Sequence, residues 1–301
     1  MSFVIAESLD QALAAMADGA RPIAGGSDLV VGTRGGKAPL PESLVAIDRV
    51  AELQLFEENP ETGHLEIGSA INHARLMSDP IVVERYTALA DAAALIGSPA
   101  TRHVGTLGGN IMNGSPAMDT GAPLVVLGAT VLLKGLASAQ RWVSIDDLWD
   151  GPGSTIAAAD ELCIAIDIPT PPPNSGSAYV RLEYRRAMEI AVVGAAAAVT
   201  LSDDGGVDSA RVALSAVAPT IIEVDDIATI VAGKAASDVL DRVAEAASQA
   251  ASPISDLRAS DQYRRHMVGV MARRAFDAAA RRASGQTITV PVNRTEGVGA
   301  A

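Results

Sequence analysis

Hydrophobic and polar positions in the first half of the chain alternate between helix-like and strand-like patterns. The segment "SLDQALAAMA" predicts a helix with Ser8 as its N-cap, ending by Gly19. Apolar residues recur on one face from about residue 80 to 96, which predicts a second helix. Between them, "RPIAGG", "SLVAIDRV" and "HLEIGSAI" are short apolar runs that break into turns. The pattern therefore predicts α/β units here.

Two further apolar runs, "PLVVLGATVLLKG" and "ELCIAIDIP", have the length of strands, although the first is also compatible with a short helix at its start. The proline-rich stretch "IPTPPPNSGS" then interrupts regular structure. Beyond it, "AYVRLEYRR" and two apolar runs joined by "SDDGG" predict strands, the last two forming a hairpin. Long amphipathic segments, "ASDVLDRVAEAASQA" and "DQYRRHMVGVMARRAFDAAARRA", predict helices.

These patterns predict an α+β protein with its main boundary at the proline-rich stretch. We expect a first domain over residues 1–170, with subdomains of about 1–55 and 56–170, and a linker over 171–177. A smaller α+β domain with an antiparallel sheet and helices is expected over 178–288, followed by a loose tail over 289–301.

Charge and hydropathy exclude several classes of partner. The 301 residues include 23 Lys plus Arg against 36 Asp plus Glu, a formal net charge of -13, and the basic residues are scattered. This balance argues against a nucleic-acid partner. The longest apolar run, "IAVVGAAAAVTL", is shorter than the roughly 18 residues of a membrane-spanning helix. We expect no integral membrane segment and, because the N-terminal pattern differs from a signal peptide, a cytoplasmic location.

Cysteine and histidine usage argues against a metal site on this chain. Cys163 is the only cysteine, so neither an internal disulfide nor a four-thiolate iron-sulfur cluster is possible. His64, His73, His103 and His266 include no pair at the i, i+4 spacing of a helical zinc site. Any redox metal must therefore lie on another chain.

Two Gly-Gly motifs carry the candidate chemistry: "IAGGSDLVVGTRGG", which begins at Ile23, and "GTLGGNIMNGSPAMD", which begins at Gly105. Either alone is most simply a tight turn. Successive backbone N–H groups in such turns can also bind phosphate without a lysine. Neither motif fits the G-x-G-x-x-G dinucleotide fingerprint, and Lys37 and Lys234 are each followed by alanine, which excludes a Walker loop.

Together the two motifs resemble those of a known family, the flavin-binding medium subunits of the molybdenum hydroxylases. The segment "AGGSDL" is similar to the family's first FAD motif and "GTLGGNI" to its second. The resemblance continues in family order through "VAIDRVAELQ", "IGSAINHARL", "GSPAMDTGAPLVVLGATV" and "YRRAMEIAVVGAAAAV". It implies an FAD-binding domain of the vanillyl-alcohol-oxidase (PCMH) type, followed by a smaller α+β domain.

The resemblance also implies cofactor-binding residues. The backbone of the first motif would wrap the FAD diphosphate, and the second would add side-chain hydrogen bonds from Thr106 and Asn110. An acidic residue that follows, Asp119, would accept hydrogen bonds from cofactor hydroxyls. The full expected set is Ile23, Ala24, Gly25, Gly26, Ser27, Asp28, Ile96, Thr106, Leu107, Gly108, Gly109, Asn110, Asp119, Cys163 and Arg181.

Several of these assignments have a structural alternative. Asp119 precedes Thr-Gly and is also suited to cap the next element. Ile96 and Cys163 are apolar residues suited to the core, and Arg181, at a position where the family commonly has lysine, is equally suited to a surface salt bridge. His103 is expected to be a structural loop residue, because flavin chemistry requires no acid or base from this chain. No catalytic residue is assigned.

The function implied is electron transfer. A large partner would hold the molybdenum cofactor, and a small partner with two [2Fe-2S] clusters would pass electrons to FAD on this chain, in a dimer of heterotrimers. The absence of cysteine ligands on this chain agrees with that division. The alternatives are a stand-alone flavin oxidoreductase of the same fold and an assembly scaffold without FAD. Neither the substrate nor the electron acceptor can be deduced from the sequence.

Overall fold

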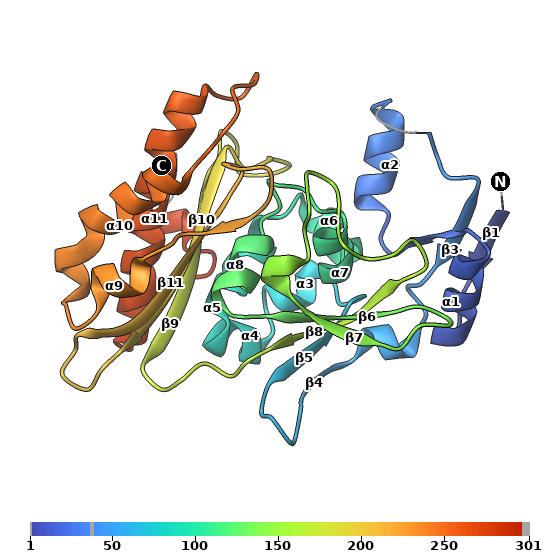
Figure 1. Ribbon diagram of the computed structural model, residues 1–301, viewed down its shortest axis with the longest axis horizontal. Coiled ribbons are helices and arrows are strands. Elements are labelled where there is room, and N and C mark those ends of the chain that lie inside the picture. The colour runs from blue at the N-terminus through green and yellow to red at the C-terminus, as the bar shows by residue number, and fades with distance from the viewer. Residues whose placement is uncertain (1, 37–38, 297–301) are drawn as a thin grey trace. The chain divides into compact units, whose positions relative to one another are not determined.

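The structure is a computed structural model that describes residues 2–36 and 39–296. The chain folds into two interleaved compact units (Figure 1). The N-terminal unit contains residues 1–75, 99–114 and 128–169, and the C-terminal unit contains 76–98, 115–127 and 170–301. None of the helices in the described ranges combines the length and the apolar character needed to cross a membrane.

The N-terminal unit begins with a small parallel sheet. Its strand order is β1-β3-β2, with bounds β1 (Ser2–Ile5), β2 (Arg21–Ile23) and β3 (Ser43–Ala46). Helix α1 (Leu9–Ala17) connects the first two strands, and the Ser8 side chain accepts from the backbone N–H of Gln11, so the predicted N-cap is confirmed. The sequence pattern did not predict β1, whose residues are all exposed.

A five-stranded antiparallel sheet forms the rest of this unit's framework. Its order is β4-β5-β8-β6-β7, and the central strand β8 is almost continuously buried, as expected for a strand covered on both faces. The strands are β4 (Phe56–Glu58), β5 (Leu65–Gly68), β6 (Thr130–Lys134), β7 (Arg141–Ser144) and β8 (Leu162–Ile168). The helices are α2 (Ser27–Arg34), α3 (His73–Leu76), α6 (Pro99–Val104), α7 (Leu107–Met112), and the 3-10 turns Ala51–Gln54 and Ile145–Asp147.

The C-terminal unit is built on a four-stranded antiparallel sheet of order β12-β11-β10-β9. The predicted hairpin is confirmed: the strands flank the turn at Gly205, whose φ of 85° is readily adopted by glycine. The strands are β9 (Ser175–Leu182), β10 (Val193–Leu201), β11 (Val207–Ser215) and β12 (Ile222–Glu223). The helices are α4 (Pro80–Arg85), α5 (Thr87–Leu95), α8 (Gly121–Val126), α9 (Ile227–Val231), α10 (Ala236–Ala250), α11 (Asp261–Ala283) and α12 (Asn293–Glu296).

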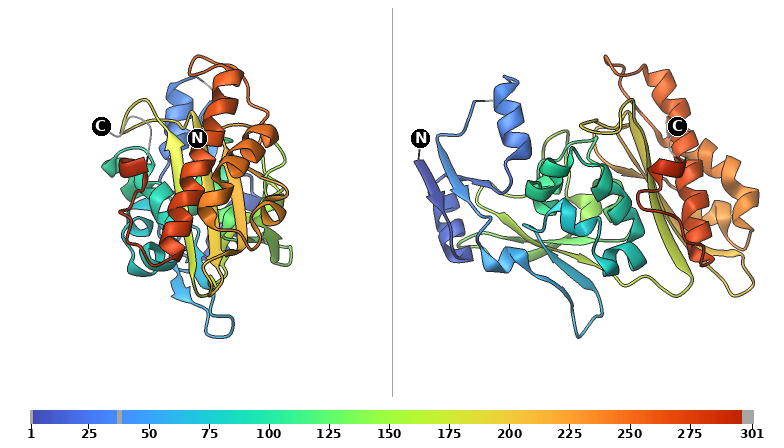
Figure 2. Two further views of the ribbon diagram at one scale, coloured as in Figure 1. Left: turned by 90° about the vertical axis from the view of Figure 1, so that its left-hand side faces the viewer. Right: turned by 180° about the vertical axis from the view of Figure 1, so that it is seen from behind.

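Helices cover both faces of this sheet. Helices α10 and α11 lie on one side, and α5 and α8 lie on the other (Figures 1 and 2). Side chains alternate accordingly along β9: Ala178, Val180 and Leu182 join the apolar core with α11, while Tyr179 and Arg181 lie on the opposite face. Because that second face is also buried, its polar side chains need partners from α5 and α8.

One predicted helix differs from the structure, and one alternative left open by the sequence is decided. The single helix expected over residues 80–96 is two helices, α4 and α5, separated at Tyr86, whose backbone (φ -120°, ψ 44°) leaves the helical region while its ring is fully buried. Helical periodicity continues on both sides, so the pattern gave no sign of the break. The run "PLVVLGATV" begins as helix α8, the alternative that the pattern had left open, and strand β6 follows it as predicted.

The segment expected to be a loose tail is packed as far as it is described. Val292 is fully buried, and its backbone N–H donates to the Asp91 carboxylate at 2.9 Å. Asn293 accepts a hydrogen bond from the Arg181 backbone N–H at 2.8 Å. Residues 297–301 of the predicted tail lie outside the described residues.

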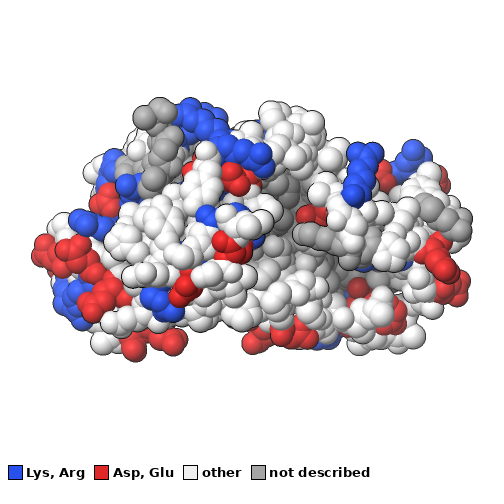
Figure 3. Space-filling view, turned by 90° about the horizontal axis from the view of Figure 1, so that it is seen from above, with Lys and Arg blue, Asp and Glu red and all other residues white. Residues whose placement is uncertain are grey.

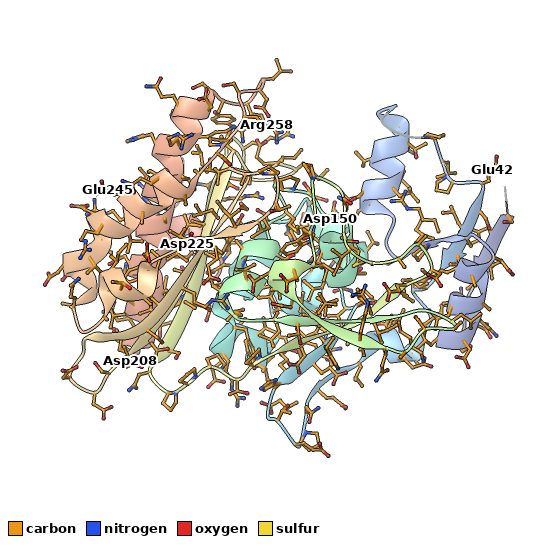
Figure 4. The ribbon with its side chains drawn as sticks, viewed as in Figure 1. Glu42, Asp150, Asp208, Asp225, Glu245 and Arg258 are labelled. Atoms are coloured by element: carbon orange, nitrogen blue, oxygen red, sulfur yellow. The ribbon has the colours of Figure 1, made fainter. Side chains whose placement is uncertain are left out.

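The face of the molecule in Figure 3 carries charged side chains of both signs. Lys and Arg are interspersed with Asp and Glu on the face shown in Figure 3. Asp208, Asp225 and Glu245 are exposed on the C-terminal unit (Figure 4).

Candidate functional site

The first Gly-Gly motif joins β2 to α2. Gly26 is the N-cap of α2 and has a φ of 65°, a conformation that favours glycine. A Cβ on Gly25 would lie 1.7 Å from the carbonyl oxygen of Val104, so only glycine fits that contact. Ser27 and Asp28 form the first turn of α2, which corrects the expectation that the whole of 23–28 is a loop.

The second motif is the start of a helix rather than a turn. Thr106 is the N-cap of α7, and its Oγ1 accepts from the Gly109 backbone N–H at 3.0 Å. Leu107 is fully buried, and a Cβ on Gly108 would lie 2.4 Å from the Cβ of Ser69. The nearby His103 lies in α6, so its expected loop placement is wrong.

The structure brings the two motifs side by side in the N-terminal unit. Gly25 packs on the Val104 carbonyl, immediately before the second motif. From the other direction, a Cβ on Gly105 would lie 3.4 Å from the Ser27 Oγ. The two glycine-rich segments therefore form one surface, although they lie about 80 residues apart in the chain. Of the remaining expected residues of this unit, Asn110 is half-buried at this surface in α7.

The surroundings of Gly109 indicate whether a ligand could fit this surface. It is exposed, its φ is not positive, and within 4 Å its Cβ position meets only the Thr106 Oγ1, at 3.0 Å. Backbone conformation thus does not call for glycine, which costs about 0.5–1 kcal/mol relative to alanine inside a helix, and among the described residues only the Thr106 Oγ1 would have to shift slightly for a Cβ. A cofactor that approaches the backbone closely would fit the space that the missing side chain leaves. The glycine-rich surface fits a diphosphate-containing cofactor in this respect.

Three of the expected site residues, Ile96, Asp119 and Arg181, belong to the C-terminal unit. Arg181 is fully buried: its Nη1 donates to Asp119 at 2.7 Å, its Nε to Glu183 at 2.9 Å and its Nη2 to the Leu95 carbonyl at 3.0 Å. The alternative that Arg181 forms a surface salt bridge is therefore wrong. Although burial opposes its charge, Asp119 raises the pKa of Arg181 above the ordinary value, with Tyr179 and Glu183 adding to this effect.

Asp119 uses both carboxylate oxygens inside this cluster. Oδ2 accepts from Arg181, and Oδ1 accepts from the Tyr179 hydroxyl at 2.8 Å. Helix α8 begins after Thr120 without a side-chain cap, so the alternative that Asp119 caps it is wrong. Ile96 is half-buried at the C-terminal end of α5.

Cys163 lies in β8, opposite Leu133 of β6. It is 2% exposed, and burial raises the pKa of its thiol to about 12, so it is protonated at neutral pH. Within the described ranges, no group of three or more His, Cys, Asp or Glu residues is arranged to hold a metal ion. Cys163 packs in the core of the N-terminal unit as its sequence alternative suggested.

Sequence reasoning missed two polar residues beside the second motif, Ser69 and His73. Both are buried, at 4% and 2% exposure, and both lie against glycines of that motif. The available signal was local: "GSAINH" places polar side chains directly after a buried strand, where the chain leaves the sheet. The motif comparison alone gave no reason to select them.

Two family models together match most of the chain. Residues 1–171 match the "FAD binding domain in molybdopterin dehydrogenase", and residues 178–279 match the "CO dehydrogenase flavoprotein C-terminal domain". The chain is 31% identical to the xanthine dehydrogenase FAD-binding subunit of Escherichia coli O157:H7 over 290 residues, which cover 95% of this chain and 98% of that subunit.

Similarity to the carbon monoxide dehydrogenases extends to solved structures. The chain is 33% identical to the carbon monoxide dehydrogenase medium chain of Afipia carboxidovorans over 274 residues, which cover 90% of this chain and 92% of that chain. The structure matches a chain of the reconstituted CO dehydrogenase from Oligotropha carboxidovorans with a TM-score of 0.88 and 31% identity, covering 94% and 98% of the two chains. The expected α+β fold and FAD as cofactor are thereby confirmed, and the chain belongs to the FAD-binding family of the molybdopterin dehydrogenases.

Proposed function

We propose that this chain is the FAD-carrying electron-transfer subunit of a heterotrimeric molybdenum hydroxylase. One contrast carries the proposal. The chain builds a glycine-rich cofactor surface, yet its single cysteine is buried and its described residues hold no cluster of metal ligands. Electrons that reach FAD by way of iron-sulfur clusters must then come from another chain. The named relatives, an FAD-binding subunit and a medium chain, support this division.

Different residues would contact different parts of the cofactor. Backbone N–H groups of the first motif hold the diphosphate, and the second motif approaches it closely through Gly109, with Thr106 and Asn110 adding polar contacts. The proposed set remains that named from the sequence: Ile23, Ala24, Gly25, Gly26, Ser27, Asp28, Ile96, Thr106, Leu107, Gly108, Gly109, Asn110, Asp119, Cys163 and Arg181. When bound, FAD supplies the redox chemistry, and this chain orients it and excludes water.

The charged cluster of the C-terminal unit gives Asp119 and Arg181 a specific part in this proposal. Because each Asp119 oxygen already accepts a hydrogen bond, the carboxylate is held in one orientation. Arg181 stays charged, so it can stabilise negative charge that develops on a reduced cofactor. Residue Cys163 would contribute apolar packing only.

The partners proposed are a large subunit with the molybdenum cofactor and a small subunit with two [2Fe-2S] clusters, assembled as a dimer of heterotrimers in the cytoplasm. The family description and the carbon monoxide dehydrogenase relatives support the molybdenum assignment. Substrate would bind the large subunit, so its identity does not depend on this chain.

Isolation of the native complex tests the proposal. We expect three chains to co-purify, with FAD, molybdenum and iron present, and the mass of the complex should equal two copies of each chain. In stopped-flow measurements the flavin absorbance should bleach only when the iron-sulfur chain is present. An isolated chain that reduces its own flavin with an organic substrate would instead establish a stand-alone oxidoreductase, and a native complex without flavin would establish a scaffold.

A further inference from the structure

A short segment that the motifs do not include runs antiparallel to the second motif. The Gly108 backbone N–H donates to the Ser69 carbonyl at 2.9 Å, and the Leu107 N–H donates to the Ile71 carbonyl at 2.9 Å. Asn72 and Thr106 form a bridge, and the His73 N–H donates to the Gly105 carbonyl at 3.1 Å. Residues 69–73 and 105–108, called the ladder below, are thus joined by three backbone hydrogen bonds around one antiparallel bridge, which holds the backbones of Ser69 and His73 in place.

The Ser69 hydroxyl is buried in this ladder without a partner. The backbone of Ser69 is bonded on both sides, since its N–H donates to the Ile164 carbonyl at 2.9 Å and its carbonyl accepts from Gly108. Its Oγ, by contrast, has no hydrogen-bond partner among the described residues. A buried hydroxyl without a partner is costly, so its presence beside the glycine-rich surface requires an explanation.

His73 presents the same situation at the other end of the ladder. The imidazole is 2% exposed, and its Nδ1 has no partner within the part of the chain that the structure describes. Burial, with a contribution from Arg102, lowers its pKa to about 4, so the ring is neutral at pH 7. A Cβ on Gly105 would lie 3.3 Å from the His73 Cδ2 and 3.4 Å from the Ser27 Oγ. The ring therefore lies where the two glycine motifs meet.

We propose that Ser69 and His73 are FAD-binding residues, which form a third wall of the cofactor site beside the two glycine motifs. The Ser69 hydroxyl and the neutral imidazole hydrogen-bond polar atoms of the bound cofactor, which satisfies the two buried groups. This inference rests on the assignment of FAD to the glycine-rich surface. It explains why the ladder holds both backbones rigidly and leaves both side chains without protein partners.

Ser69→Ala separates a ligand contact from a merely structural role, because the two affect different measurements. Without FAD, the full-length variant should unfold at a higher temperature than the wild type, since an unpaired buried hydroxyl has been removed. In the FAD-depleted native complex, titration with FAD should give a dissociation constant about threefold to tenfold above that of the wild type. Ser144→Ala, which removes a β7 hydroxyl that donates to Asp146 outside both motifs, is the control and should leave the affinity unchanged.

His73 is tested by two substitutions. His73→Leu removes both ring nitrogens and should weaken FAD binding about tenfold or more, whereas His73→Asn places an amide near the Nδ1 position and should recover most of the affinity. His64→Leu, at a partly exposed histidine that pairs with Asp167, is the control and should bind FAD normally. Circular dichroism of each full-length variant verifies that it folds.

The results of these experiments distinguish a failure of the inference about Ser69 and His73 from a failure of the FAD assignment. If Ser69→Ala and His73→Leu both bind FAD with the wild-type dissociation constant, the two side chains are satisfied by buried water and the inference is overturned. If His73→Leu is weak but His73→Asn is equally weak, ring packing rather than a hydrogen bond explains the loss, which overturns the role of His73. If the wild-type complex holds no FAD, the cofactor assignment itself has failed.

Discussion

Buried polar side chains differ between the two units in how completely they are hydrogen-bonded. On the sheet face of the C-terminal unit, Asp91 accepts from both Arg282 Nη atoms and from two backbone N–H groups, and Asp119 is paired with Arg181. Buried nitrogens without a described partner in this unit belong to arginines whose other nitrogens are bonded. In the N-terminal unit, Ser69 and His73 have unpaired side-chain atoms and lie against glycines.

This difference distinguishes buried polar residues that stabilise the fold from buried polar residues that bind a ligand. A complete set of partners is expected where buried charge holds elements of the fold together, because an unpaired charge there would be strongly destabilising. Buried polar side chains that lack hydrogen-bond partners, and that lie beside glycines, are expected where a bound ligand supplies the missing hydrogen bonds. Substitution of Asp91 or Arg282 should therefore affect stability, whereas substitution of Ser69 or His73 should affect cofactor affinity.

The largest expected effect is on the C-terminal unit. Asp91→Ala would leave the buried Arg282 guanidinium without its carboxylate, and the free energy of unfolding should fall by about 3–5 kcal/mol. Urea denaturation followed by circular dichroism measures the change. Asp241→Ala, which removes the exposed partner of Arg273, should change it by less than about 1 kcal/mol. Equal effects of the two substitutions would show that burial of the Asp91 pair is not what stabilises this unit.

A smaller but still large effect is expected from Gly25→Ala. The new Cβ would collide with the Val104 carbonyl, so the backbone must move, at a cost of about 3 kcal/mol, the upper end of the usual range for overpacking. FAD should also be lost, because the two motifs separate. Gly151→Ala, at a glycine outside both motifs with no positive φ and only the Ser154 Cβ at 4.0 Å, is the control for both measurements. A stable, yellow Gly25→Ala protein would contradict the contact between the motifs.

The pH dependence of stability should report His73. Its folded pKa of about 4 lies below its ordinary value of 6.5, so between these values the unfolded chain binds more protons and stability falls as the pH decreases. The contribution amounts to about 3 kcal/mol between pH 6.5 and pH 4. Urea denaturation over this range should show a shallower profile for His73→Asn than for the wild type. Parallel profiles would mean that His73 is not buried as described.

The smallest effect on stability is expected at Gly109, and it should have the opposite sign. Gly109→Ala should stabilise the chain by about 0.5–1 kcal/mol, since the helix tolerates a Cβ there, while FAD binding weakens. Gly109→Val should abolish FAD binding in a folded chain. Flavin absorbance per chain after purification and urea denaturation measure the two effects. If Gly109→Val purifies with a full complement of FAD, the second motif does not contact the cofactor.

Local sequence signals predicted much of the fold. The Asp-Gly turn placed the hairpin at Gly205, Ser8 capped the first helix, and the two long amphipathic segments became α10 and α11. Signals that depend on distant partners were missed. Strand β1 pairs with β3, which is about 40 residues away, and the break at Tyr86 is stabilised by burial of its ring.

The candidate site was predictable only where the motif itself carries the information. The glycines could be selected from their spacing, but the structural need for glycine differs between them. A side chain at Gly25 or Gly108 would collide with the chain, whereas a Cβ at Gly109 would meet only the Thr106 Oγ1, at 3.0 Å. Ser69 and His73 depend on the ladder between residues 69–73 and 105–108, which no local pattern shows. The pairing of Arg181 with Asp119 is equally non-local, so the sequence left its burial undecided.

The distance along the chain between Asp91 and Arg282 has a consequence for biosynthesis. The two residues are 191 positions apart, and a ribosome that adds 5–20 residues per second needs roughly 10–40 s to make the intervening chain. Strand β9, which packs on α5, is complete only about halfway through that time, and Arg282, the partner of Asp91, is made at the end of helix α11. The nascent chain must therefore be protected from aggregation until its last long helix emerges, which makes recombinant yield sensitive to chaperone supply and to growth temperature.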